Sequence, residues 1–351
     1  MKILVTGISG FIGSHVAAAL AALGHDVTGV YRHNPPRKVP EYEHGFMNFP
    51  VKKGTVTPQQ ADISDGKTVE KLTRGMDGVI HIAGRASDWG TREQFYRANF
   101  MPIRHFIAAF QNNAPRFFIH TSTISVYGFG AHRHTTEEGP YYRITHPYQT
   151  SKLASEKLLF TYAAENSSPA LAIIRPANVY GPGDTTLMYP ILNAVNTGKM
   201  GLVNKGRYLT SPIFIDDLVS AYIALMNTLT DSPQQVHGRT YNITSGEIIT
   251  WEEKIALCAA TLKCPIPKLT APRLPALIAA YGVTGVYHLI RSKTPPDLTV
   301  YRVKHVSSDY HFSINRAIHD LHWKPETFFR EGIIPTVKAW REYMSDRYEK
   351  K

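Results

Sequence analysis

Short apolar runs alternate with helical patterns along the first half of the chain. The runs lie at residues 2–5, 26–31, 78–83, 116–121 and 170–175. Each has the length of a buried strand, and the segments between them have the longer apolar periodicity of helices. This alternation predicts an α/β fold with a doubly wound parallel sheet, in which ligands bind at the carboxyl ends of the strands.

A glycine-rich turn follows the first apolar run. Residues 6–13 read TGISGFIG, and residues 14–23 are predicted to form a helix. Gly7 would permit the tight turn, Gly10 would let the backbone approach a diphosphate, and Gly13 would let the helix pack closely on the sheet. The turn predicts a site for a dinucleotide; the alternative is a tight strand-to-helix turn with nothing bound.

Tyr148 and Lys152 stand four residues apart. Side chains at this spacing share one face of a helix, so the ammonium would lie beside the phenol. A phenol has an ordinary pKa of about 10, and a nearby positive charge would lower it toward the range useful for proton transfer. The pair is a candidate proton relay, although an isolated match also occurs on solvated helix faces.

Composition agrees with a soluble enzyme of one large α/β unit and a smaller lobe. The chain has 351 residues, of which 43% are hydrophobic and 19% charged. The net charge of +11 is scattered, which argues against nucleic acid as a partner and favours an anionic substrate, cofactor or lipid surface.

The two cysteines and the start of the chain predict the compartment. Cys258 and Cys264 have no zinc-motif spacing, so we expect two structural thiols and no metal. The first strand begins almost at Met1, which leaves no room for a targeting peptide. A cytoplasmic protein without disulfides is expected.

Six ordered motifs resemble the extended short-chain dehydrogenases/reductases, also called the NAD-dependent epimerase/dehydratase family. The resemblance covers nearly the whole chain and implies a Rossmann fold, an NAD(P) cofactor and enzymatic activity. Asn99 falls on the asparagine that the family carries in a helix. The matching segments are Thr6–Gly13 (TGxxGFxG), Asp62–Ile63, His81–Gly84 (HxAx), Ser122–Gly128 (SSxxVYG), Tyr148–Lys152 (YxxxK) and Arg175–Gly183 (RPxNVYGPG).

The resemblance implies roles for three catalytic residues. Thr123 would hydrogen-bond the substrate oxygen, Tyr148 would pass the proton, and Lys152 would hold the nicotinamide ribose and favour the tyrosinate. Hydride would move between the nicotinamide and the substrate carbon. Ser122 or Ser125 is the alternative hydroxyl.

The resemblance also implies a larger set of ligand contacts. For Asn99, which is one of them, the alternative is a purely structural role. Substrate contacts are expected at Arg85, Trp89, Thr123 and Asn178. The cofactor contacts are expected at Gly7, Ser9, Gly10, Phe11, Ile12, Gly13, Arg32, Asp62, Ile63, Ile82, Ala83, Gly84, Asn99, Thr121, Tyr148, Lys152, Pro176, Asn178 and Val179.

The end of the second apolar run predicts the form of the cofactor. An NAD enzyme usually carries an acid there for the ribose hydroxyl, whereas a basic side chain accommodates the phosphate of NADP. The chain has Tyr31, Arg32 and His33 at this place, with Arg37 and Lys38 nearby. We predict NADP(H), with Arg32 on the phosphate; NAD(H) and a merely exposed arginine are the alternatives.

Departures from the family motifs narrow the choice of reaction and substrate. The Asp-Glu pair of the dehydratases is replaced by Ile124 and Ser125, so dehydration is not expected. Thr210 stands where epimerases carry an arginine for the diphosphate, and their later arginine motif has no counterpart before His311. These absences disfavour a nucleotide sugar, whereas Asn178 weakly favours one.

The later part of the chain resembles the 3β-hydroxysteroid dehydrogenase and β-keto or flavonol reductase branches. The similar segments are 87–90, 295–299 and 321–325. The prediction is an NADP(H)-dependent oxidoreductase that interconverts a secondary alcohol and a ketone on an apolar or mixed small molecule. An NAD-dependent sugar epimerase and a non-catalytic NADP(H)-sensing regulator are the alternatives.

Two predictions concern the division into domains and the assembly of subunits. Residues 1–175 with about 212–262 would form the dinucleotide-binding domain, in which 241–243 return to the main sheet, and about 176–211 with 263–351 would form the substrate lobe. The resemblance implies a homodimer formed through the helices that carry Tyr148 and Asn99.

Residues 274–290 form an apolar segment of 17 residues that is marginal for spanning a bilayer. A substrate lid or a packing helix is expected there. The alternative is weak peripheral contact with lipid, helped by Arg273, Arg291 and Lys293.

Overall fold

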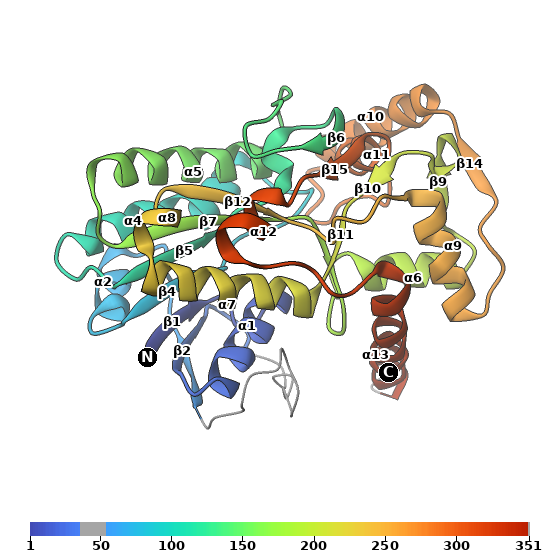
Figure 1. Cartoon of the computed structure of the whole chain (residues 1–351). Helices are drawn as coiled ribbons and strands as arrows, with labels where there is room; N and C mark the ends of the chain where they lie inside the picture. Colours follow the sequence, from blue (N-terminus) through green and yellow to red (C-terminus); the bar gives the residue numbers. More distant parts are fainter. Residues whose placement is uncertain (36–53, 350–351) are drawn as a thin grey trace.

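The computed structural model describes residues 1–35 and 54–349, and its centre is a seven-stranded sheet in which every neighbouring pair is parallel (Figure 1). The strands, from one edge to the other, are β12 (Arg239–Ile243), β7 (Ala170–Pro176), β5 (Phe117–Thr121), β4 (Gly78–His81), β1 (Lys2–Thr6), β2 (Asp26–Tyr31) and β3 (Thr55–Gln60). The order switches between β1 and β4, where doubly wound sheets bind ligands. The doubly wound fold and the return of 241–243 to the sheet are therefore confirmed.

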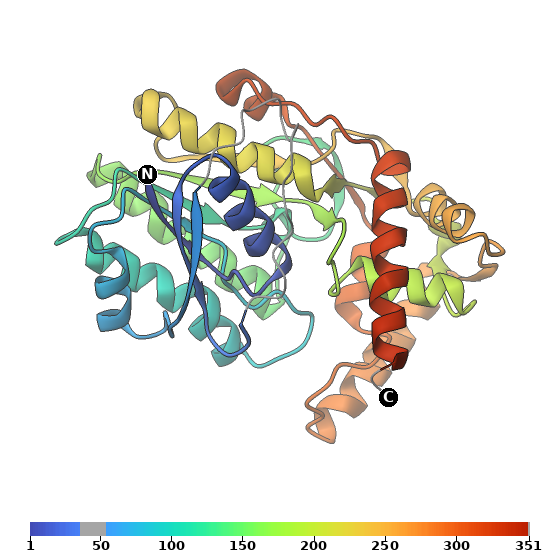
Figure 2. The same ribbon diagram turned by 90° about the horizontal axis from the view of Figure 1, so that it is seen from below.

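Helices cover both faces of this sheet (Figures 1 and 2). On one face lie α1 (Phe11–Ala22) and α7 (Ile215–Asp231), and on the other lie α2 (Gly66–Thr73), α4 (Met101–Phe110) and α5 (Pro147–Glu165). Alternate residues of a strand point to opposite faces. Ile3 and Val5 accordingly join the apolar cluster of α1 and α7, whereas Leu4 joins that of α2 and α4. Burial on both faces explains why the central strands are continuous apolar runs.

The β3 strand gave no apolar signal in the sequence. It is an edge strand, and most of its side chains are exposed. Pro58 lies within it, which is tolerated at a sheet edge because that backbone needs no ladder donor on its outer side.

Outside the sheet, short strands pair in twos. These pairs are β8 (Asn178–Tyr180) with β11 (Pro212–Phe214), β9 (Gly201–Val203) with β14 (Leu269–Ala271), β10 (Leu209–Thr210) with β13 (Ile249–Thr250), and β6 (Ala131–Thr135) with β15 (Asp309–Phe312). The remaining helices are α3 (Arg92–Phe95), α6 (Met188–Asn196), α8 (Pro233–Val236), α9 (Trp251–Leu262), α10 (Arg273–Leu289), α11 (Val300–Val306), α12 (Asn315–Leu321) and α13 (Phe329–Glu349).

Residues 212–262 contribute to both parts of the molecule. They supply β12 and α7 to the sheet layers, but α9 packs against α6 and α13. One apolar cluster runs without interruption from Ile3 in the sheet to Ile255 on α9 and Trp340 on α13. The division into two domains stays a prediction.

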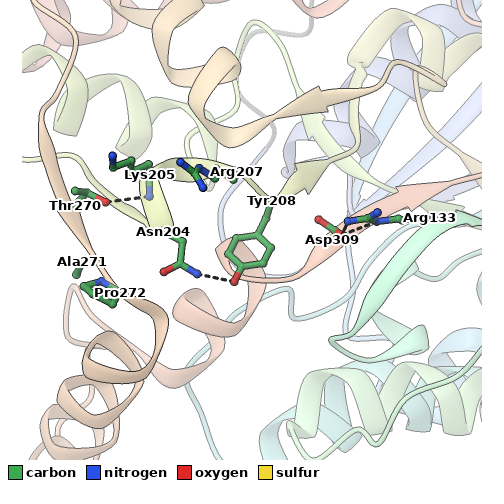
Figure 3. A pocket seen from close by; sticks show the side chains of 9 residues that line it. All are labelled: Arg133, Asn204, Lys205, Arg207, Tyr208, Thr270, Ala271, Pro272 and Asp309. Carbon is green, nitrogen blue, oxygen red and sulfur yellow. Dashed lines mark hydrogen bonds and ion pairs between the residues drawn. The ribbon is translucent and has the colours of Figure 1, made fainter.

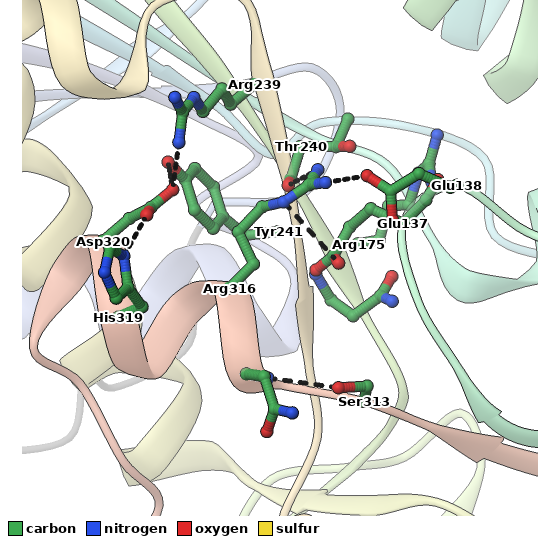
Figure 4. Close-up of polar contacts among 12 residues, drawn as sticks. Glu137, Glu138, Arg175, Arg239, Thr240, Tyr241, Ser313, Arg316, His319 and Asp320 are labelled. Atoms are coloured by element: carbon green, nitrogen blue, oxygen red, sulfur yellow. Dashed lines mark hydrogen bonds and ion pairs between the residues drawn. The ribbon is translucent and has the colours of Figure 1, made fainter.

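Helix α12 is tied to the edge strand β12 by ion pairs (Figure 4). Arg239 pairs with Asp320 at 2.8 Å, and the same carboxylate accepts the Tyr241 hydroxyl at 3.1 Å. Arg316 pairs with Glu138 in the turn after β6. These contacts cover a sheet edge that would otherwise offer unpaired backbone groups.

Helix α10 packs by a narrow face and exposes the rest. Ala280 is buried against Val303 of α11, whereas Leu274, Ile278 and Leu289 are exposed by 68%, 64% and 84%. Among the residues that the structure describes, no helix is long and apolar enough to cross a membrane.

Candidate active site

The glycine turn joins β1 to α1. Gly10 N donates to Gly7 O at 2.9 Å, and a Cβ at Gly13 would collide with the same carbonyl oxygen. Only glycine fits that close approach. The helix begins at Phe11, three residues before the predicted start, because the apolar pattern used to place it begins only after the last glycine. The N-terminus of α1 therefore faces the carboxyl edge of the sheet.

Thr6 joins β1 to the end of β4 by side-chain hydrogen bonds, at the point where the strand order reverses. Its hydroxyl accepts hydrogen bonds from Ile82 N and Ala83 N, both at 3.1 Å, and lies 2.8 Å from His81 Nδ1. Burial and the charge of Lys152 lower the pKa of His81 to about 3, so the ring is neutral; because the Thr6 hydroxyl already accepts two N–H groups, its own O–H is available to donate to Nδ1. The sequence signal for this role is the threonine that opens the glycine motif.

The structure brings Thr123, Tyr148 and Lys152 together. Thr123 follows β5, and its hydroxyl accepts Ser125 N at 3.1 Å and forms a side-chain hydrogen bond with Tyr148. Tyr148 lies in the first turn of α5, which His146 caps by accepting Tyr148 N at 3.3 Å. A strand end and a helix start thus meet at the predicted catalytic hydroxyls.

Lys152 is anchored on the end of β5. Its ammonium donates to Thr121 O at 2.7 Å, and burial lowers its pKa to about 8 against the opposing charge of Glu156. Burial raises the pKa of Tyr148, and the Thr123 hydrogen bond opposes this only in part. The predicted lowering of the Tyr148 pKa is therefore wrong for this structure, because desolvation outweighs any nearby positive charge.

Asn99 links the end of β4 to α5. It lies in a π-helical turn, Tyr96–Phe100, and is completely buried. Its Oδ1 accepts Arg85 N at 2.7 Å, and its Nδ2 donates to Ser151 Oγ at 2.9 Å. A Cβ at Gly84 would lie 2.9 Å from Asn99 Oδ1 and 3.3 Å from Lys152 Nζ. The backbone beside the lysine is therefore open only because residue 84 is glycine.

Arg32 and Asp62 lie near the ends of β2 and β3. Arg32 is exposed, and its carbonyl accepts Gln60 Nε2 at 3.1 Å. Burial tends to raise the pKa of Asp62, but hydrogen bonds from Ser64 and the charges of Arg32 and Arg97 hold it below its usual value. Arg37 and Lys38 lie outside the described residues.

The other predicted contacts line the same edge of the sheet. Thr121 Oγ1 lies 2.6 Å from Tyr222 OH, and Asn178 Nδ2 donates to Thr210 Oγ1 at 3.0 Å. Asn178 thus bonds the residue that stands where epimerases carry an arginine. The remaining positions are Ser9, Gly10, Phe11 and Ile12 at the start of α1, Ile63 after β3, and Pro176 and Val179 around the end of β7.

Trp89 is buried against α10. Its Nε1 donates to Ser292 O at 3.0 Å, and its ring stacks on His288 with centroids 4.3 Å apart. Arg85 Nη2 in turn donates to Trp89 O at 2.9 Å. These two predicted substrate contacts fasten the loop after β4 to the second lobe, and their contact with substrate stays a prediction.

Sequence reasoning missed Tyr301, which α11 carries into the catalytic region. Its hydroxyl lies 3.2 Å from Ser125 Oγ, and its ring lies 4.7 Å from the His146 ring. Nothing in the sequence links residues 125 and 301, which are 176 positions apart.

A separate cavity of about 500 Å³ lies outside the central sheet, around Asn204 to Tyr208 (Figure 3). Arg133 and Asp309 pair across one side at 2.8 Å, and Asn204 Nδ2 donates to Tyr208 OH at 2.8 Å. None of the predicted catalytic residues lines this cavity, so it is distinct from the site at the sheet edge.

The described residues contain no group of three or more histidine, cysteine or acidic side chains that could hold a metal ion. Cys258 and Cys264 are free thiols. The glycine turn at the α1 N-terminus and the open backbone at Gly84 beside Lys152 do fit a nicotinamide dinucleotide, whose phosphates and ribose need such close approaches.

Comparison with known proteins agrees with this geometry. The model of the NAD dependent epimerase/dehydratase family matches residues 3–244. The 2-alkyl-3-oxoalkanoate reductase of Shewanella oneidensis is 25% identical over 94% of this chain and 84% of its own length. The sterol-4-alpha-carboxylate 3-dehydrogenase, decarboxylating, of Mus musculus is 23% identical over 99% of this chain and 92% of its own.

Solved structures share the fold. The UDP-glucuronic acid 4-epimerase of Bacillus cereus, in complex with NAD, superposes with a TM-score of 0.74 and 21% identity over 98% of this chain and 99% of its own. The family match covers more than half of the chain, and the relatives are named reductases and dehydrogenases. The chain therefore belongs to the NAD-dependent epimerase/dehydratase family and is an NAD(P)-dependent oxidoreductase of the extended short-chain dehydrogenase/reductase type.

Proposed function

We propose that this enzyme interconverts a secondary alcohol and a ketone with NADP(H), using Thr123, Tyr148 and Lys152. The observation that carries the proposal is that the Thr123 hydroxyl lies close enough to the Tyr148 phenol to lower its pKa, beside a lysine held by Thr121 O. Two neighbouring hydroxyls can both turn to one substrate oxygen.

Each residue has a distinct part in this reaction. Thr123 orients the substrate oxygen, and Tyr148 gives it a proton during reduction or removes one during oxidation. Lys152, fixed on the Thr121 carbonyl, holds the nicotinamide ribose, and Asn99 keeps β4 and α5 in register around it. The nicotinamide supplies or accepts the hydride when it is bound.

Arg32 supports the preference for NADP(H). It is the exposed cation at the end of β2, where a carboxylate would contact the ribose of NAD. A guanidinium matches a phosphate in charge and geometry. The NAD named with the structural relatives is the alternative cofactor.

The names of two relatives suggest the kind of substrate. A 2-alkyl-3-oxoalkanoate and a sterol-4-alpha-carboxylate oxidised at position 3 both carry a carboxylate on the carbon next to the one that bears the reacting oxygen. We propose that this enzyme acts on 3-oxo or 3-hydroxy acyl compounds with an apolar remainder.

Cofactor turnover separates this function from its alternatives. Purified enzyme should convert NADP(H) steadily when it is given a carbonyl or alcohol substrate, with the rate followed at the nicotinamide absorbance. A sugar epimerase would leave the net redox state of its cofactor unchanged, and a cofactor-sensing regulator would bind NADPH without turnover. Either result would contradict the proposal.

Three further proposals concern membrane contact, cellular location and assembly. The exposed apolar side chains of α10 stand among seven lysine or arginine residues and one aspartate in residues 263–304, which supports weak contact with an anionic membrane surface. A cytoplasmic homodimer, formed through α5 and the helical segment around Asn99, remains the expectation for location and assembly.

A further inference from the structure

Helix α11 brings a second phenol to the catalytic hydroxyls. Tyr301 OH lies 3.2 Å from Ser125 Oγ, Ser125 N donates to Thr123 Oγ1, and Thr123 bonds with Tyr148. Burial raises the pKa of Tyr301, and the neighbouring phenol of Tyr148 adds to this effect. Four hydroxyl-bearing side chains therefore gather at one end of the sheet.

The Tyr301 ring has a defined position. It lies 4.7 Å from the His146 ring, next to the start of α5, and 5.0 Å from the Phe129 ring. Two packed aromatic neighbours restrict the ring, so its hydroxyl stays directed at Ser125.

The helix that carries Tyr301 is anchored on the nucleotide-binding part of the molecule. Thr299, its N-cap, donates to Asp88 Oδ2 at 2.8 Å, and Arg302 pairs with the same carboxylate at 2.7 Å. Asp88 belongs to the loop that follows β4. The two lobes therefore place the Tyr301 hydroxyl jointly.

Tyr310 is a neighbouring phenol whose own proton is already used. Its hydroxyl donates to the backbone at Gly128 O at 2.9 Å, and it also lies near the Ser125 hydroxyl, which lowers its pKa against the larger effect of burial. Within residues 1–35 and 54–349, the Tyr301 hydroxyl has a hydrogen bond only with Ser125. Two hydroxyls bonded to each other keep a donor available for a ligand, whereas the donor of Tyr310 is already used.

We infer that Ser125 and Tyr301 together bind an oxygen of the acyl group that the substrate carries on the carbon next to the reacting carbon, and that Tyr301 is a specificity-determining residue. This inference rests on the proposed function, because it concerns the same substrate. Both donors are neutral, and the nearby Arg302 is neutralised by Asp88. The pair therefore suits the sp2 oxygen of a carboxylate and that of an ester equally.

Three probes that differ only in the acyl group test this inference. We would measure kcat and KM for oxidation of 3-hydroxyoctanoate, its methyl ester and 2-heptanol, with NADP⁺ and with NAD⁺. Tyr301→Phe removes one hydroxyl and keeps the ring, Ser125→Ala removes its partner, and Tyr310→Phe is the matched control.

The expected results differ by probe. Tyr301→Phe should lower kcat/KM for one or both acyl probes about ten-fold, mainly through KM, as expected for one lost hydrogen bond, and should change 2-heptanol less than about two-fold. Tyr310→Phe should leave the ratio between the probes unchanged. The free acid and the methyl ester distinguish a carboxylate from a neutral acyl oxygen as the preferred ligand.

Two outcomes would overturn the inference in different ways. Equal loss on all three probes in Tyr301→Phe, or no loss at all, would mean that Tyr301 only supports the fold or does nothing, while the proposed function would stand. Wild-type enzyme that oxidises none of the probes with either cofactor would overturn the inference and the proposed function together.

Discussion

The Glu156 carboxylate accepts two hydrogen bonds from the Arg175 guanidinium, at 2.9 Å from Nε and 2.7 Å from Nη2. Both side chains are almost completely buried, and the guanidinium lies 4.8 Å from the centre of the Tyr127 ring. Glu156 is one helical turn after Lys152 on α5, and Arg175 is on β7. The ion pair therefore fixes the helix of the catalytic lysine on the sheet.

Removing one partner of this pair should destabilise the protein strongly. Arg175→Met leaves the Glu156 charge buried and unpaired, and we expect a loss of about 3–5 kcal/mol in the free energy of unfolding. Urea denaturation followed by circular dichroism measures it. The pair of Arg239 with Asp320 provides a control: the Arg239 side chain is half exposed and Asp320 keeps its bond with the Tyr241 hydroxyl, so Arg239→Met should cost less than about 1 kcal/mol. Similar losses in both variants would contradict the role given to burial.

The hydroxyl pair should control the pH dependence of alcohol oxidation, which needs the Tyr148 phenolate. Burial raises the pKa of Tyr148, so the rate should keep rising on the alkaline side of neutrality. Thr123→Val removes the hydrogen bond that lowers this pKa; the alkaline limb should move to higher pH, and kcat/KM should fall by about 10²–10⁴. Thr123→Ser, which keeps the hydroxyl, should retain the wild-type profile. An unchanged limb in Thr123→Val would show that the bond does not act on Tyr148.

Cofactor preference should depend on Arg32. Arg32→Ala removes the cation at the end of β2, and we expect NADPH to bind at least about ten-fold more weakly, with NADH binding unchanged. Fluorescence titration of the reduced nicotinamide measures both. Arg104→Ala, an exposed arginine on α4, should change neither. Tighter binding of NADH than of NADPH by the wild type would contradict the preference.

Lys254 is a buried cation whose removal should stabilise the protein at neutral pH. It is completely buried, its Nζ has no hydrogen-bond partner among the described residues, and it lies 4.9 Å from the Trp251 ring centroid. Burial lowers its pKa to about 8, against the opposing charges of Asp184 and Glu247. The unfolded chain therefore holds this proton more tightly than the folded one, so the buried charge lowers the free energy of unfolding. This loss of stability is fully present below pH 8 and fades as pH rises toward 10.4.

Lys254→Met should accordingly raise the free energy of unfolding by up to about 3 kcal/mol at pH 7, and the difference from wild type should shrink by pH 10. Chemical denaturation at both pH values measures this change. The exposed Lys338→Met on α13 should show no such dependence. A destabilised Lys254→Met at pH 7 would mean that its contacts with the rings outweigh the cost of burying the charge.

Lipid contact should depend on the exposed face of α10. Vesicles that contain phosphatidylserine should bind the wild type weakly, and Leu274→Glu with Ile278→Glu should abolish binding, because two carboxylates would have to enter the interface. Flotation of the protein with vesicles measures this. Ile248→Glu alters an equally exposed apolar residue elsewhere and should leave binding intact. Wild-type protein that never floats would rule out the membrane contact.

Local patterns in the chain were sufficient to predict the fold and to select the residues proposed to be catalytic. The buried strands are continuous apolar runs because both faces of the sheet are covered, and the glycine turn is required by the close approach of residue 13 to the Gly7 carbonyl. The spacing of Tyr148 and Lys152 on one helix is also local. These features depend on neighbours in the sequence, so they are visible in it.

Contacts between distant segments decided the rest. Burial sets the pKa of Tyr148 and Lys152, and the short spacing between them carries no information about desolvation. Trp89 is held by Ser292, and Tyr301 meets Ser125, only because the second lobe folds back onto the ends of the strands. The surroundings of the proposed site therefore depend on long-range packing, whereas the residues proposed for the proton relay lie in short sequence motifs.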